Sequence, residues 1–97
     1  FILLQGRVED NPGQSTLNTI FIYHTGFDEM LRSVSLTKSI SINEENQQTL
    51  SLYLNIDKLF YDAATPIDLL VENVTESSGD ELELAQRMSD NFAKAFE

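Results

Sequence analysis

The stretch Phe21-Ile22-Tyr23-His24-Thr25-Gly26 decides how this chain of 97 residues is interpreted. It closes an apolar run whose alternation with a period of two predicts a β-strand over residues 16–25. Apolar side chains on both sides of the strand predict that it is central and covered on both faces. One face is expected to carry Ile20, Ile22 and His24, and the other Phe21 and Tyr23.

His24 is the only histidine of the chain, and it lies near the end of this strand in phase with an apolar row. Two interpretations stay open. His24 is either a hydrogen-bonded residue of the core or its rim, or a metal ligand, because a neutral imidazole nitrogen is a common ligand near neutral pH. His24 is therefore the candidate metal-ligating residue of the chain.

Three further stretches alternate in the same way. Residues 1–8 predict a strand, and residues 33–42 and 50–56 predict two more around a polar loop at 43–48. The last two strands are expected to form an antiparallel pair with one solvent-exposed face. Lys38 falls in the apolar phase, which predicts a bulge, a sheet edge or a guard against edge pairing. The inward-facing residues of the pair are expected to be Val34, Leu36, Ile40, Ile42, Leu50, Leu52, Leu54 and Ile56.

Residues 80–96 predict a C-terminal helix packed on the sheet. Asp80 and Glu83 have the spacing of a capping box at its start. The helix then carries apolar residues at spacings of three and four, which draw one stripe along it. This stripe predicts a packing face, with a partner-binding face as the alternative. Its members are Ala85, Met88, Phe92 and Phe96.

Together these elements predict a mostly β fold: an antiparallel β-sandwich-like domain with a C-terminal α-helix. Residues 1–97 are interpreted as a single β-rich domain or as the C-terminal half of one, because a chain this short buries a thin core. Residues 57–61 are expected to form a short helical turn or strand exit, anchored by Leu59 and Phe60.

Composition excludes several classes of function. The chain has 16 acidic and 6 basic residues, a net charge of −10, which disfavours nucleic-acid binding because such a field repels phosphates. It has no cysteine, which excludes disulfides and thiolate chemistry. No apolar run approaches the roughly 18 residues of a membrane-spanning helix. Without a nucleophile elbow or a glycine-rich phosphate loop, the chain is predicted not to be an enzyme.

Four stretches form an ordered set that covers nearly all of the chain. They are Phe1-Ile2-Leu3-Leu4-Gln5-Gly6; Phe21-Ile22-Tyr23-His24-Thr25-Gly26; Leu54-Asn55-Ile56-Asp57-Lys58-Leu59-Phe60 with Pro66-Ile67-Asp68-Leu69 behind it; and Ala85-Gln86-Arg87-Met88-Ser89-Asp90-Asn91-Phe92. In this order the chain resembles the C-terminal half of the MbnP-like family, extracytoplasmic β proteins that include copper-binding members related to MopE.

The resemblance implies a non-enzymatic β-sandwich protein of the bacterial envelope, in the periplasm or at the outer-membrane surface, with a lipid anchor upstream. It implies copper binding or copper trafficking by the full-length protein, with His24 matching the downstream histidine of the family. The family's tryptophan motif would precede Phe1, and this chain has no tryptophan. One histidine cannot complete a copper site. The alternative is therefore a structural or accessory lipoprotein subunit that docks onto an outer-membrane or periplasmic protein partner.

Overall fold

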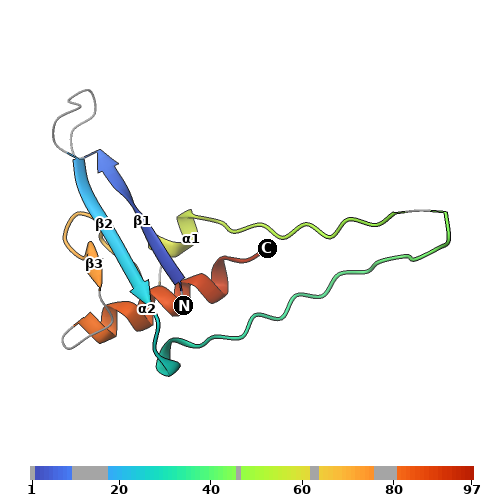
Figure 1. The fold of residues 1–97 in the computed structure, drawn as a ribbon. Coiled ribbons are helices and arrows are strands. Elements are labelled where there is room, and N and C mark those ends of the chain that lie inside the picture. The colour runs from blue at the N-terminus through green and yellow to red at the C-terminus, as the bar shows by residue number, and fades with distance from the viewer. Residues whose placement is uncertain (1, 10–17, 46, 62–63, 76–80) are drawn as a thin grey trace.

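The computed structural model describes residues 2–9, 18–45, 47–61, 64–75 and 81–97. Their strands form one sheet in the order β1-β2-β3, in which β1 and β2 are antiparallel and β2 and β3 are parallel (Figure 1). This is a mixed α/β fold, and the described residues form no second sheet of the kind that the predicted β-sandwich requires. The elements are β1 (Ile2–Glu9), β2 (Asn18–Thr25), η1 (Asp28–Met30), α1 (Asp57–Phe60), β3 (Val74–Thr75) and α2 (Leu82–Ala95).

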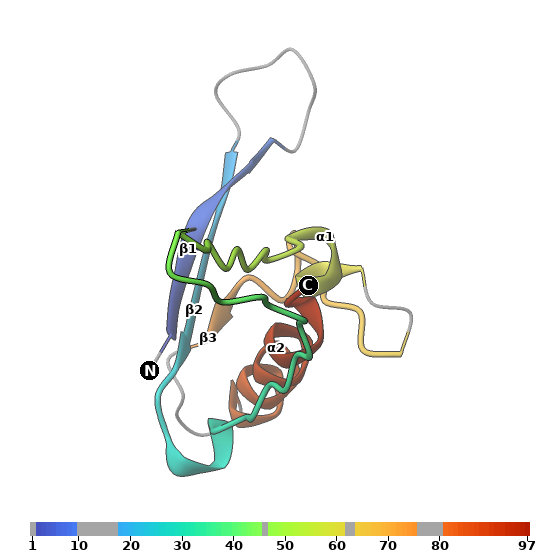
Figure 2. The ribbon, with the colours of Figure 1, turned by 90° about the vertical axis from the view of Figure 1, so that its right-hand side faces the viewer.

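Helix α2 lies against one face of the sheet, as Figure 2 shows. Its predicted apolar stripe is confirmed as a packing face, because Ala85, Met88 and Phe92 are buried. The predicted capping residue Asp80 lies outside the described residues. The short α1 also follows the prediction, since Leu59 and Phe60 are buried in the same core as Tyr23 of β2.

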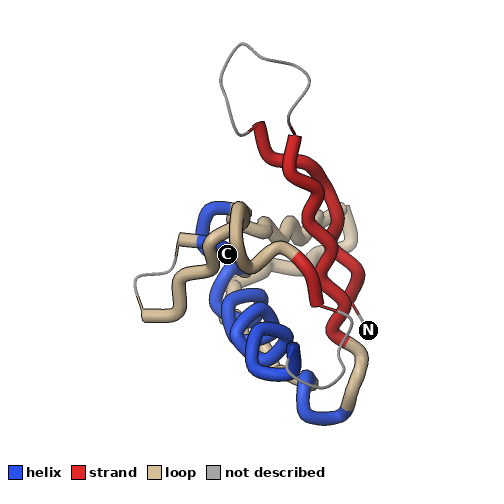
Figure 3. The backbone as a smooth tube through the Cα atoms, turned by 90° about the vertical axis from the view of Figure 1, so that its left-hand side faces the viewer, coloured by secondary structure: helices blue, strands red, loops and turns tan. Residues whose placement is uncertain are grey.

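The strand register decides which side chains face α2. Leu4 stands opposite Tyr23, and both contribute to the core, whereas Leu3 stands opposite His24 on the other face. Leu3 and Ile20 on that outer face are 48% and 51% exposed. The expectation that β2 is covered on both faces is therefore wrong for the described residues, because α2 is a single layer and covers one face only (Figure 3).

Gly6 occupies the position in β1 opposite Phe21. A Cβ atom on residue 6 would lie 2.5 Å from the Cζ atom of the Phe21 ring, so the absence of a side chain is what lets the ring lie over the strand. The same ring lies 5.8 Å, centroid to centroid, from the rings of Tyr23 and Phe60. The glycine thus leaves room for a cluster of aromatic rings on the face of the sheet that borders the core.

Buried polar contacts fasten α2 to the segment between α1 and β3. Asn91 is fully buried, and its Nδ2 donates to the carbonyls of Leu59 and Thr65 at 2.8 and 2.9 Å. One turn earlier, Arg87 forms an ion pair with Glu72 and donates to the carbonyl of Pro66 at 2.9 Å. These contacts satisfy backbone groups of a segment that has little regular structure.

The predicted antiparallel pairing between residues 33–42 and 50–56 is wrong. Both segments are extended in the structure, but no strand is assigned to either, and none of the backbone hydrogen bonds among the described residues joins them. The two segments are attached to different parts of α2. Alternation predicts which side chains share a face, and it does not identify the strand that pairs with them.

None of the helices in the described part of the chain has the length and apolar character needed to span a membrane.

Candidate functional site

The main candidate site is an arm formed by residues 33–56. Its outgoing segment (33–42) and its return segment (47–56) extend from the body to a tip, as Figure 1 shows. Large apolar side chains along both segments are exposed to solvent, Ile42 at 80% and Leu50 at 61%. The other exposed members are Val34, Leu36, Ile40, Leu52, Tyr53 and Ile56.

Such an arm is chemically able to contact another polypeptide. Unpaired N–H and C=O groups along extended backbone accept an added strand, and exposed apolar rows gain free energy when they are covered. An isolated pair of extended segments has marginal stability in water even when the two are hydrogen-bonded to each other. The arm therefore has exposed apolar rows that a covering surface would stabilise.

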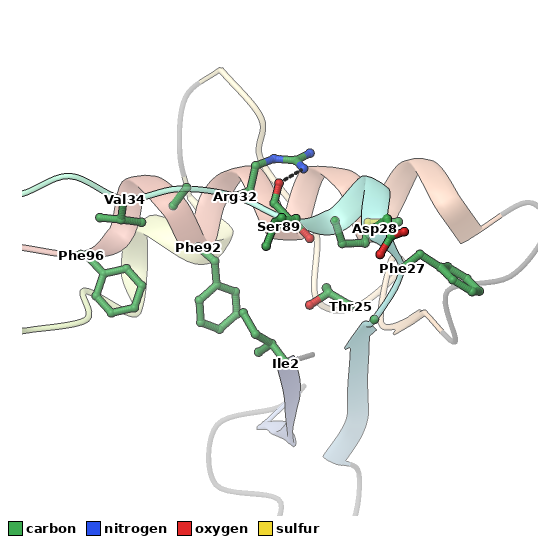
Figure 4. Close-up of a pocket in the computed structure, with 13 residues that line it drawn as sticks. Ile2, Thr25, Phe27, Asp28, Arg32, Val34, Ser89, Phe92 and Phe96 are labelled. Atoms are coloured by element: carbon green, nitrogen blue, oxygen red, sulfur yellow. Dashed lines mark hydrogen bonds between the residues drawn. The ribbon is translucent and has the colours of Figure 1, made fainter.

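The outgoing segment is fixed to the middle of α2. Arg32, just before the segment, forms an ion pair with Asp90 and donates to the carbonyl of Glu29 at 2.7 Å. Val34 then lines a pocket of about 280 Å³ together with Phe92 and Phe96 (Figure 4). This pocket lies between α2, η1 and the start of β1, so the root of the arm is apolar on its inner side.

The return segment is fixed to the end of α2 by a short antiparallel ladder. Tyr53 and Glu97 exchange both backbone hydrogen bonds, at 3.0 and 2.8 Å, and Leu54 bridges to Phe96. In Figure 1 these last residues lie at the base of the arm between its two segments. The return segment thus already accepts a strand along its inner edge.

Three polar side chains interact at the base of the arm, next to the ladder of Tyr53 and Glu97. Lys58 Nζ lies 2.6 Å from Oε1 of Glu97, and Asn55 Nδ2 donates to the same oxygen at 3.3 Å. The hydrogen bond from Lys58, with that from Asn55, lowers the pKa of Glu97. The carboxylate therefore stays ionised and keeps residues 95–97 aligned with the return segment.

The arm differs from the body in charge. It contains Lys38, Glu44 and Glu45, a net charge of −1 out of the chain's −10. Both glutamates are at the tip, and residues 47–56 of the return segment have no charged side chain. An acidic body thus carries a nearly neutral arm with apolar rows along both segments.

His24, the predicted metal ligand, lies away from the arm on the outer face of the sheet, opposite Leu3. It is half-buried. No group of three or more histidine, cysteine, aspartate or glutamate residues that could hold a metal ion occurs in the part of the chain that the structure describes.

The sequence pattern predicted an antiparallel pair with one solvent-exposed face for these residues and did not predict the arm. Two signals pointed to it. The loop at 43–48 contains no glycine, although tight hairpin turns favour one. Lys38 also interrupts the apolar phase of its segment, as charges at unpaired strand edges often do.

Comparison of the chain with protein-family models, with curated proteins and with solved structures found no match.

Proposed function

We propose that this chain is a non-enzymatic binding protein whose arm associates with extended segments of another polypeptide. The observation that supports this most directly is that the arm exposes alternating apolar side chains, and that no backbone hydrogen bond among the described residues joins 33–42 to 50–56. Strand addition to an exposed backbone edge is a recurrent mode of recognition, in which the backbone supplies affinity and alternate side chains supply specificity.

The body supports this function by holding the arm rigidly at two places. The Arg32–Asp90 ion pair fixes one segment, and the Tyr53–Glu97 ladder fixes the other. A surface that is held in its bound conformation loses less conformational entropy on association. Strands added to the arm would build a second sheet beside β1-β2-β3, and this would complete the β-sandwich that the sequence predicts.

The resemblance to the MbnP-like family adds a setting to the proposal: docking onto an outer-membrane or periplasmic protein of the bacterial envelope. Copper binding by the full-length protein, with His24 as one ligand, remains a separate proposal that the resemblance alone supports. The two are compatible, because His24 lies outside the arm.

Hydrogen exchange tests the binding function. In protein isolated under native conditions with its partners in place, backbone amides of 33–42 and 49–54 should be protected, while those of the tip at 43–45 exchange fast. Helix α2 serves as the internal standard for a folded body. Exchange of the arm amides at the rate of an unstructured peptide, with α2 protected, would contradict the proposal.

A further inference from the structure

The charge and side-chain pattern of the arm indicate what binds to it. We propose that the arm of this chain binds the arm of a second copy, which enters from the opposite end. This inference rests on the proposed function of the arm as a strand-accepting surface.

The two segments of one arm are held apart where they leave the body. Asp90, which fixes the outgoing segment, and Ala95, which accepts a hydrogen bond from the backbone of Asn55, are five residues apart in α2. Five helical residues span about 7.5 Å along the axis, so the two segments are attached to different turns of α2. Among the described residues, Tyr53 and Asn55 bond to residues 95–97 and no backbone hydrogen bond joins 33–42 to 50–56, so backbone edges of the arm are left for strands from elsewhere.

The occupant must be extended, alternating and nearly uncharged. The outgoing segment of a second copy has this character, since Lys38 is its only charged residue and, apart from Lys38, every second side chain from Val34 to Ile42 is apolar. A two-fold axis would bring the same segments of both arms together, as in most homodimers. Each then supplies the strand partners and apolar cover that the other lacks.

Charge favours the antiparallel arrangement of the two arms. Outside the arm each chain carries a net charge of −9, so two bodies placed side by side would repel each other. Arms that enter from opposite ends keep the bodies at the two ends of the dimer. Each chain measures 55 Å along its longest axis, whereas charges are screened beyond about 8 Å at physiological ionic strength. The repulsion between the bodies is then small.

The size of the arm also fits. A stable protein–protein interface uses roughly 20–30 residues from each partner, and residues 33–56 fall within that range. The apolar rows of the two segments would form its centre and the tip residues Glu44 and Glu45 its polar rim.

Sedimentation equilibrium of the whole chain, combined with hydrogen exchange over a range of concentrations, tests the inference. We expect a mass near twice 11.0 kDa at high concentration, with arm amides that become protected as the dimer forms. Added salt should change the stability of the dimer little, because the acidic bodies lie far apart at its two ends.

Two double variants test whether the dimer depends on the apolar row or on the polar row of the arm. Leu36→Asp with Leu52→Asp places two carboxylates in the apolar phase and should abolish the dimer. Thr37→Asp with Ser51→Asp adds the same charge to the same segments in the polar phase, and should leave most of the dimer. All four positions are exposed in the single chain, so α2 amides should stay protected in both variants.

The outcomes distinguish this inference from the proposed function. A chain that is monomeric at every concentration overturns the second copy as occupant, even where natively isolated protein shows a protected arm and so upholds the binding function. A dimer that survives Leu36→Asp with Leu52→Asp, or that protects amides outside the arm only, also overturns it. Arm amides that exchange freely in the chain alone and in the native assembly overturn both proposals.

Discussion

The hydroxyl of Tyr23 donates a hydrogen bond of 2.7 Å to the main-chain carbonyl of Glu72. This contact joins the central strand of the sheet to the segment that leads into β3. Burial raises the pKa of Tyr23 to about 12, and the nearby charges of Glu72 and Asp68 add to the shift. The folded state therefore keeps the phenol protonated at pH values where the unfolded chain, with a pKa of about 10, loses the proton.

Stability should consequently be unaffected by Tyr23 below about pH 10 and should fall between about pH 10 and 12, because the unfolded state releases its proton first. The expected loss is about 2–3 kcal/mol, measured by urea unfolding across this range. Tyr23→Phe should cost about 1 kcal/mol at neutral pH and lack this part of the alkaline loss. An identical alkaline loss in the variant would contradict the assignment.

The Glu72–Arg87 ion pair predicts a response to acid. The hydrogen bond from Arg87 lowers the pKa of Glu72, so this carboxylate contributes stability above its unfolded pKa of about 4.3 and loses it as the pH falls further. Glu72→Gln should remove a contribution of up to about 1 kcal/mol at neutral pH. Its stability should then change less than that of the wild type below about pH 5; equal slopes would count against the pair.

Asn91 predicts a large effect from one buried amide. Asn91→Ala leaves the carbonyls of Leu59 and Thr65 without their donor, and should reduce the free energy of unfolding by about 3 kcal/mol. Ser89→Ala is the matched control on the same helix. Ser89 is also buried, but its Oγ donates to the carbonyl of Ala85 four residues earlier, so the control should cost less than about 1 kcal/mol. Equal losses of free energy of unfolding would show that the Asn91 amide contributes no more than the Ser89 hydroxyl.

Gly6→Ala tests the close approach of the Phe21 ring. The added Cβ atom forces the ring to move, and the expected destabilisation is about 1–3 kcal/mol by thermal or denaturant unfolding. Combining Gly6→Ala with Phe21→Leu should cost less than the sum of the two single changes, because the smaller side chain leaves room for the Cβ atom. Strict additivity would mean that the ring does not constrain residue 6.

Copper analysis tests the role expected for His24. If His24 is a ligand, the copper content of natively isolated protein should fall in His24→Asn, which retains a polar side chain of similar shape. The arm variants Leu36→Asp with Leu52→Asp should leave the copper content unchanged, since His24 lies on the outer face of the sheet. Copper content that is the same in His24→Asn and in the wild type would exclude His24 as a ligand.

Sequence periodicity predicted the elements whose partners lie within the chain. The alternation around Tyr23 placed β2, and the spacing of Ala85, Met88 and Phe92 identified the face of α2 that is buried. These predictions succeeded because the period of a regular element follows from backbone geometry alone. Strand β3, at two residues, is too short to show a period.

The arm could not be predicted in the same way. Residues 33–42 alternate as cleanly as β2 does, yet they are exposed. Alternation identifies the side chains that share a face, but it does not show whether another part of the chain covers that face. The contacts of Asn91 and Glu72 were also invisible, because each depends on residues that meet only in the folded chain. The sequence showed the tendency to form strands, but not which segments pair with one another.

The arm interrupts the body along the chain, and this sets the order in which the protein can form during synthesis. Strands β1 and β2 leave the ribosome before the arm and can pair. The core around Tyr23 can form only after α1 and α2, which follow the arm, have also emerged. At about 5–20 residues per second, residues 57–97 take on the order of seconds to emerge. For that time two apolar rows, one of them interrupted by Lys38, are exposed beside an unfinished core, a situation that favours early engagement by a chaperone.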